Sequence, residues 1–125
     1  MEKKILVVED DPYTNELISN LLSTRGFNMI SVTTGEEAIE YVKDNIPDLV
    51  ILDLLLPRLD GWEICKILHK SGTKTARVPI LVVSVLSRFD SVVFGPEMAG
   101  VSFFSKPFEA AGLIAEVERI FKKTP

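Results

Sequence analysis

A single acid, Asp53, lies within an otherwise apolar stretch of the sequence, residues 49–57. Runs this apolar are typical of a strand that is covered on both faces, and burying an unpaired carboxylate is costly. Asp53 is therefore predicted to lie at the open end of a strand or to be paired with another group. A carboxylate placed in this way could act as a nucleophile and take up a phosphoryl group as an aspartyl-phosphate.

Suitable partners follow the other apolar runs. Asp10 and Asp11 come after the first run, Ser84 ends the fourth, and Lys106 ends the fifth. Parallel strands end at one edge of a sheet, so these side chains are predicted to converge on Asp53. Crowded carboxylates repel each other unless a cation intervenes, which predicts Mg²⁺, with Mn²⁺ as a substitute. This metal, the ammonium of Lys106 and the hydroxyl of Ser84 would match the three oxygens of a phosphoryl group.

The elements that must position these groups alternate along the chain. Strand-like runs are predicted at residues 5–8, 28–32, 48–53, 79–84 and 102–106, with helical spacing of apolar residues between them. This alternation predicts an α/β fold, a five-stranded parallel doubly wound sheet with five helices in three layers. Gly95 and Pro96 interrupt the fourth helix, where a kink or a restart is expected.

Composition narrows the class of protein. A chain of 125 residues with 46% hydrophobic residues suits one domain, residues 1–125, and argues against disorder. The net charge is −4 without a basic run, so nucleic-acid binding by this domain is not expected. No apolar run is long enough for a membrane span, and the N-terminus does not have the pattern of a signal peptide. The single cysteine, Cys65, excludes an internal disulfide and favours a reducing, cytoplasmic location.

The sequence resembles the receiver domain of bacterial two-component response regulators, including chemotaxis receivers, over essentially its whole length. The motifs that carry this resemblance stand in the family's order and spacing. They are Glu9-Asp10-Asp11, residues 53–61, Ser84, and Lys106-Pro107-Phe108. The resemblance implies a flavodoxin-like sheet in the order 2-1-3-4-5.

The resemblance also implies a phosphoacceptor site. Asp53 would take a phosphoryl group from the phosphohistidine of a sensor histidine kinase or of a histidine phosphotransfer protein. Asp10, Asp11 and Asp53 would hold Mg²⁺ together with the backbone carbonyl of Leu55. Asp11 is in addition a candidate N-cap of the first helix.

A conformational switch is implied as well. Ser84 would be the switch hydroxyl, and Lys106 would pair with a phosphate oxygen, with a cis bond to Pro107. Phe103 would be the switch aromatic, although its neighbour Phe104 could face inward in its place. The output would reach a downstream effector domain or protein, and the chain could be a receiver domain excised from a longer response regulator. No turnover of an external substrate is implied, so the domain is not expected to be an enzyme.

Two alternatives remain open at this level. A pseudo-receiver would keep the fold as an interaction module without phosphorylation. The branched Val85 beside Ser84, which could narrow access to Asp53, and the interrupted fourth helix favour it. The pair Asp10 and Asp11, together with Asp53 and Lys106, argues against it. A magnesium-dependent phosphohydrolase would need a second acid two residues after the nucleophile, where this sequence has Leu55.

Further positions carry weaker expectations. Leu55 and Leu86 are apolar and cannot orient an attacking water, which predicts slow loss of the phosphoryl group. His69 is expected at the surface. Tyr13 and Asn15 open the first helix, either as part of a solvated face or as contacts for a phosphodonor protein.

Overall fold

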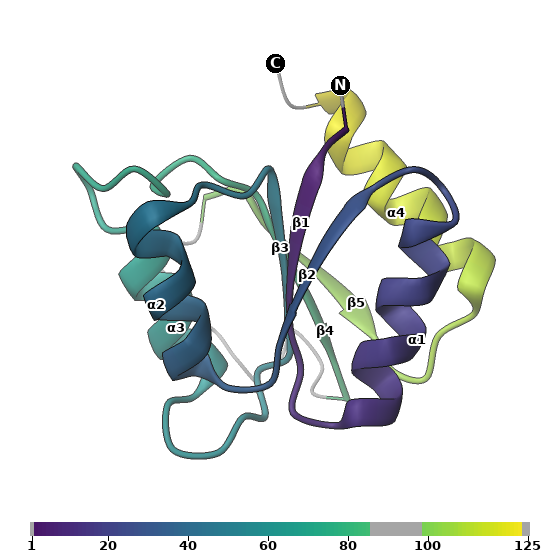
Figure 1. The fold of residues 1–125 in the computed structure, drawn as a ribbon, viewed down its shortest axis with the longest axis horizontal. Coiled ribbons are helices and arrows are strands. Elements are labelled where there is room, and N and C mark those ends of the chain that lie inside the picture. Colours follow the sequence, from purple (N-terminus) through teal and green to yellow (C-terminus); the bar gives the residue numbers. More distant parts are fainter. Residues whose placement is uncertain (1, 86–98, 124–125) are drawn as a thin grey trace.

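Five parallel strands form one sheet in the order β2-β1-β3-β4-β5 (Figure 1). The computed structural model describes residues 2–85 and 99–123. The strands are β1 (Lys4–Val8), β2 (Asn28–Val32), β3 (Leu49–Leu52), β4 (Ile80–Ser84) and β5 (Val101–Ser105). The predicted sheet and its strand order are confirmed, and each predicted strand boundary lies within one residue of the observed one.

Helices cover both faces of this sheet. They are α1 (Pro12–Ser23), α2 (Gly35–Asp44), α3 (Gly61–Leu68) and α4 (Ala110–Lys123). Figure 1 shows α1 and α4 on one face and α2 and α3 on the other. The prediction of five helices therefore holds only in part, because the described residues contain four helices. The predicted helix with Gly95 and Pro96 falls within residues 86–98, outside the described residues.

None of the described helices combines the length and the apolar character that crossing a membrane requires.

The inner strands β1, β3 and β4 are apolar along nearly their whole length because each face of the sheet has its own core. Ile5 and Val7 of β1 pack on the α1 and α4 side, whereas Leu6 and Val8 pack on the α2 and α3 side. Successive side chains of a strand point to opposite faces, so a sheet covered twice needs a continuous apolar run. Charged side chains are consequently confined to the strand ends.

Side-chain caps fix where three helices begin. Asp11, Thr34 and Asp60 are the N-caps of α1, α2 and α3, and each accepts a hydrogen bond from the backbone N–H three residues later. Thr34 also forms a capping box with Glu37. These caps therefore fix the first residue of each of the three helices.

The start of α3 lies against the backbone that follows β3. A Cβ atom on Gly61 would come within 2.5 Å of the Leu54 Cα and 2.8 Å of the Asp53 carbonyl oxygen. We expect Gly61→Ala to lower the free energy of unfolding by about 2–4 kcal/mol, because backbone atoms would have to shift. Gly112→Ala is the matched control within α4, since its Cβ would meet only a side-chain atom, Phe104 Cζ, at 3.3 Å. Chemical denaturation of both variants tests this; an equal loss in both would contradict it.

His69 is buried, which corrects the expectation of a surface residue. It is the C-cap of α3, and its ring folds inward so that Nε2–H donates to the Val78 carbonyl oxygen at 2.6 Å. The neighbouring Lys70 suggested solvent, but the ring bonds to the segment that leads into β4. Cys65 is also buried, and burial raises the pKa of its thiol to about 12.

Candidate functional site

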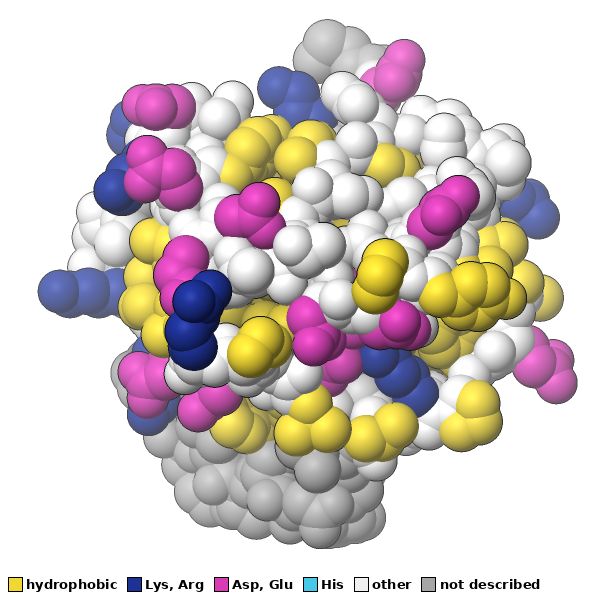
Figure 2. All heavy atoms as spheres, turned by 60° about the horizontal axis from the view of Figure 1, so that its bottom comes forward, with side chains coloured by type: hydrophobic (Ala, Val, Ile, Leu, Met, Phe, Trp, Pro, Cys, Tyr) yellow, Lys and Arg dark blue, Asp and Glu magenta, His cyan; other side chains and the backbone are white. Residues whose placement is uncertain are grey.

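The strands end at the lower edge of the sheet in Figure 1, and charged residues directly follow three of them, β1, β3 and β5. Figure 2 turns this edge forward and shows acidic side chains beside a basic one, with hydrophobic side chains on either side. The residues come from the turn after β1, the segment after β3 and the segment after β5. The predicted convergence on Asp53 is therefore observed for Asp10 and Lys106.

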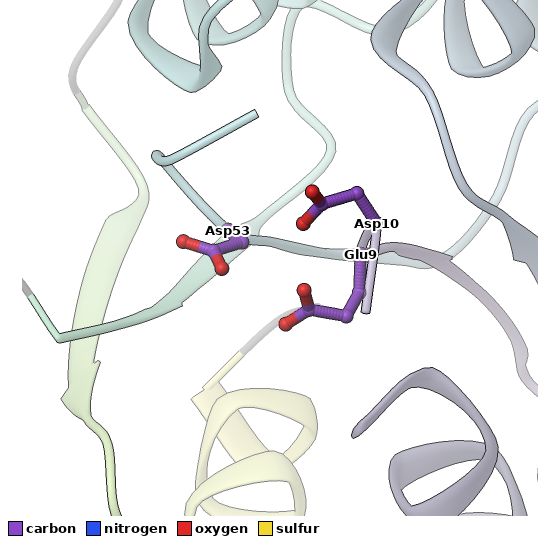
Figure 3. Close-up of side chains that lie close together, drawn as sticks. All are labelled: Glu9, Asp10 and Asp53. Carbon is purple, nitrogen blue, oxygen red and sulfur yellow. The ribbon is translucent and has the colours of Figure 1, made fainter. Parts of the chain in front are cut away.

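Three carboxylates form the centre of this edge. One oxygen from each of Glu9, Asp10 and Asp53 lies within 4.8 Å of the others. Figure 3 shows Glu9 and Asp10 extending from the end of β1 towards the side on which Asp53 lies. Glu9 and Asp53 are only 2% and 7% exposed, whereas Asp10 is open to solvent. An oxygen-only cluster with one open side fits a hard divalent cation.

Lys106 supplies the positive charge at the cluster. Its Nζ donates to Asp53 Oδ2 at 2.9 Å and also pairs closely with Glu9 Oε1. The backbone N–H of Lys106 donates to the Ser84 carbonyl oxygen at 2.9 Å, which ties the lysine to the end of β4. The Lys106–Pro107 bond is cis, as predicted.

Burial and pairing with neighbouring charges shift the pKa values of Glu9 and Lys106. Burial raises the pKa of Glu9 above 4.5, and the charge of Asp53 adds to this, although hydrogen bonds from Lys106 and from the Asp11 N–H act against it. Burial alone would lower the pKa of Lys106, but its hydrogen bonds to Glu9 and Asp53 outweigh this and raise it above 10.5. Lys106 is therefore charged throughout the physiological range.

Asp11 caps the first helix and lies outside the carboxylate cluster. Its carboxylate accepts from the Thr14 hydroxyl at 2.5 Å and from the Thr14 N–H at 3.2 Å, as the N-cap of α1. The hydroxyl of Thr14 is the main reason why the pKa of Asp11 is lowered. Glu9, not Asp11, joins Asp10 and Asp53 in the cluster. Strand β1 ends at Val8, so Glu9 is the first residue past it, and Asp11 is already committed to the helix.

The difference between capping and metal binding can be measured. Asp11→Ala should lower thermal stability because the cap is lost, yet change Mg²⁺ affinity by less than about twofold. Asp10→Ala should weaken Mg²⁺ binding by at least roughly tenfold, since it removes a carboxylate of the cluster. Asp11→Ser is the control, because serine keeps a capping oxygen and should restore stability. Calorimetric Mg²⁺ titration checks this; a large loss of affinity in both Asp11 variants would make Asp11 a ligand.

The backbone after Asp53 also contacts its carboxylate. Asp53 Oδ1 accepts from the Leu55 N–H at 2.9 Å, and the Asp53 N–H donates to the Val8 carbonyl oxygen at 3.1 Å. Both carboxylate oxygens of Asp53 are thus held, one by Leu55 and one by Lys106. The leucine side chain itself is 50% exposed.

Ser84 and Phe103 lie on the two strands beside β3. Ser84 ends β4 and is buried. Phe103 is half-buried on the α2 and α3 side, where its ring centroid lies 5.9 Å from that of Trp62 in α3. Phe104 faces the other side and packs near Phe108. The structure thus places Phe103 and Phe104 on opposite faces of β5, and the switch roles of Ser84 and Phe103 stay predictions.

Exposed apolar side chains flank the carboxylates. Tyr13, Leu55 and Val85 are 76%, 50% and 63% exposed; they lie in the first turn of α1, in the segment after β3, and directly after Ser84 of β4. The apolar surroundings of the acidic edge in Figure 2 agree with this. Val85 points into solvent, so its role in restricting access to Asp53 stays a prediction.

Two residues that belong to the geometry of this edge, Glu9 and Asn15, were not predicted for it from the sequence. Glu9 was read only as part of an acidic motif, although an acid directly after a strand was the available signal. Asn15 is buried and contacts the turn that carries Glu9. Its signal is weak, because an asparagine early in a helix is more often exposed.

Comparisons with known proteins agree with this geometry. A family model described as the response regulator receiver domain matches residues 5–118. The chain is 34% identical over 124 residues to the alkaline phosphatase synthesis transcriptional regulatory protein PhoP of Bacillus subtilis, covering 99% of the chain and 50% of PhoP. It is 34% identical over 117 residues to the DNA-binding response regulator MtrA of Mycolicibacterium smegmatis, covering 94% of the chain and 50% of MtrA.

A solved receiver-domain structure has the same fold as this chain. The receiver domain of the Francisella response regulator 1452 superposes with a TM-score of 0.84 at 27% identity, covering 99% of this chain and 100% of that one. The chain spans about half the length of the curated relatives that it matches.

Proposed function

Because the chain belongs to the family of response regulator receiver domains of two-component systems, we propose that it is a phosphorylation switch whose acceptor is Asp53. The observation that carries this proposal is the position of the Asp53 carboxylate. It lies at the open edge of the sheet, within reach of two further carboxylates and in contact with the Lys106 ammonium. This combination of groups suits the transfer of a phosphoryl group to a carboxylate.

The described residues of the cluster fit a magnesium ion. Glu9, Asp10 and Asp53 offer oxygen atoms only, which are the ligands that Mg²⁺ or Mn²⁺ prefers. The carbonyl of Leu55 is a further candidate ligand. When bound, the cation would offset the negative charge that the carboxylates and the phosphoryl oxygens bring together.

The transfer would proceed in line. An Asp53 carboxylate oxygen forms the new bond to phosphorus while the P–N bond to the donor's histidine breaks, and the electron pair of that bond stays on the imidazole nitrogen. Lys106 keeps its charge throughout and offsets the charge gained at the edge, because its pKa is raised. Leu55 N–H holds one Asp53 oxygen in place before the reaction.

Phosphorylation would then shift the population between two surfaces. An aspartyl-phosphate carries nearly two negative charges on its phosphoryl oxygens in place of the single charge of the Asp53 carboxylate, close to the end of β4. Ser84 would respond as a hydroxyl donor, and Phe103 would transmit the change through β5. This makes the domain a switch and not an enzyme with an external substrate. A phosphohydrolase would need an acid at position 55, where the side chain is that of leucine.

The partners follow from this role. We assign a sensor histidine kinase or a histidine phosphotransfer protein as donor, acting in the cytoplasm. The output would pass to an effector. One relative, MtrA, is named a DNA-binding response regulator, and the match to this chain covers half of its length.

The test is incubation of the chain with acetyl phosphate, with and without Mg²⁺, followed by intact-mass measurement. We expect a mass gain of one phosphoryl group that requires Mg²⁺. No gain under any condition would favour the pseudo-receiver, which keeps the fold but not the chemistry.

The lifetime of the phosphorylated form is a separate prediction. Leu55→Asn should shorten its half-life several-fold, because a polar side chain beside Asp53 can orient the attacking water. Decay of the phosphorylated mass species in excess chelator gives the half-life. Leu17→Asn, on the exposed part of α1, is the control, and an unchanged half-life in Leu55→Asn would refute the prediction.

A further inference from the structure

The turn that carries two of the three carboxylates is held by a buried amide. Asn15, in α1, is only 5% exposed. Its Nδ2 donates to the Glu9 carbonyl oxygen at 3.0 Å and to the Val32 carbonyl oxygen at 2.9 Å. One side chain therefore joins the end of β1, the end of β2 and the first part of α1.

Neighbouring contacts fix the orientation of this amide. The Glu9 N–H also donates to the Val32 carbonyl oxygen, at 3.2 Å. Asn15 Oδ1 accepts from the Ser19 hydroxyl at 3.4 Å, and Ser19 Oγ lies 2.7 Å from Ser31 Oγ of β2. With an acceptor contact on one side, the two donors of the amide are directed at the two strand ends.

The geometry of the peptide bond carries this constraint to Asp10. The carbonyl oxygen of Glu9 and the N–H of Asp10 belong to one rigid plane, so holding the oxygen sets the direction in which the chain enters Asp10. In the part of the chain that the structure describes, the Asp10 carboxylate has no hydrogen-bonding partner of its own. Its position in the cluster of Figure 3 therefore depends on the backbone.

We propose that Asn15 is a positioning residue for the metal site formed by Glu9, Asp10 and Asp53. It keeps the Asp10 carboxylate near the other two before any cation arrives. This inference rests on the proposed function, because it assumes that the cluster binds Mg²⁺. Groups that orient metal ligands through hydrogen bonds typically change metal affinity by about 10–100-fold when they are removed.

The experiment compares Asn15→Leu and Asn15→Ala with Thr75→Val. Leucine keeps most of the volume of asparagine, and alanine serves if leucine does not fit. Thr75 is also 5% exposed and donates to one buried carbonyl, that of Leu68, at 2.6 Å, but it is outside the cluster. It is the control for the loss of a buried hydrogen bond without a change at the site.

Two measurements are needed, Mg²⁺ affinity by calorimetry and amide hydrogen exchange without metal. We expect both Asn15 variants to bind Mg²⁺ about tenfold more weakly and to exchange faster at Glu9, whereas Thr75→Val keeps the affinity of the original chain. Unchanged affinity in the Asn15 variants, with the original chain binding normally, would overturn the inference and leave the proposed function standing. Failure of the original chain to bind Mg²⁺ would overturn both.

Discussion

Replacing Asp53 by asparagine is expected to reduce phosphoryl uptake from acetyl phosphate to the background level. The amide oxygen of asparagine is a poor nucleophile, so the bond to phosphorus cannot form at this position. Asparagine can still accept the Leu55 N–H, which now donates to Asp53 Oδ1 at 2.9 Å, so the local backbone should persist. Intact-mass measurement at saturating Mg²⁺ gives the phosphorylated fraction.

Asp60→Asn is the matched control for this substitution. Asp60 lies in the same segment between β3 and α3, but its carboxylate caps α3, accepting from the Glu63 N–H at 3.0 Å. Asparagine is an equally good cap, so this variant should be phosphorylated like the original chain. A normal mass gain in Asp53→Asn would show that another side chain is the acceptor.

Lys106→Met is expected to lower the phosphorylation rate by about 10²–10³-fold. It removes the ammonium that would face the charge developing on the phosphoryl group, a loss of the size seen when one such donor is removed. The variant should also be less stable by about 2 kcal/mol at neutral pH, because Glu9 and Asp53 would stay buried without their cation. The cost stays moderate because the Lys106 side chain is itself 17% exposed.

The stability loss in Lys106→Met should depend on pH with a definite sign. The pKa of Glu9 is raised above 4.5, so the folded protein takes up a proton more readily than the unfolded chain as the pH falls. Protonation of Glu9 relieves the repulsion, and the deficit should therefore be smaller near pH 5 than at pH 8. Urea denaturation at both pH values measures this. Lys66→Met, on the exposed side of α3, is the control; equal deficits in the two variants would exclude a special role for Lys106.

Much of the fold could be predicted because the inner strands β1, β3 and β4 are apolar on both faces. Such runs are hard to confuse with helices here, since each is short and bounded by acids, glycine or proline. The convergence of Asp53, Ser84 and Lys106 followed from parallel topology alone. The helix predicted around Gly95 and Pro96 lies outside the described residues, so its kink stays a prediction.

The structure differs from the expectations at Asp11, Asn15 and His69 for one reason. Each of these polar side chains can bond to more than one group, and the sequence does not show which group it bonds to. Asp11 could serve as a ligand or as a cap, and the cap prevails because Thr14 offers two donors within reach. Asn15 and His69 look like surface residues by type, yet each lies in the interior because strand and loop carbonyls need a donor. Such pairings depend on tertiary contacts that no local spacing reveals.

The contact between Trp62 and Phe103 gives this protein a built-in optical probe. Trp62 is the only tryptophan in the 125 residues, so its emission can be assigned without labelling. Its ring lies 5.9 Å from that of Phe103. Any rearrangement of Phe103 would change the surroundings of the indole, and stopped-flow fluorescence could follow the movement in real time.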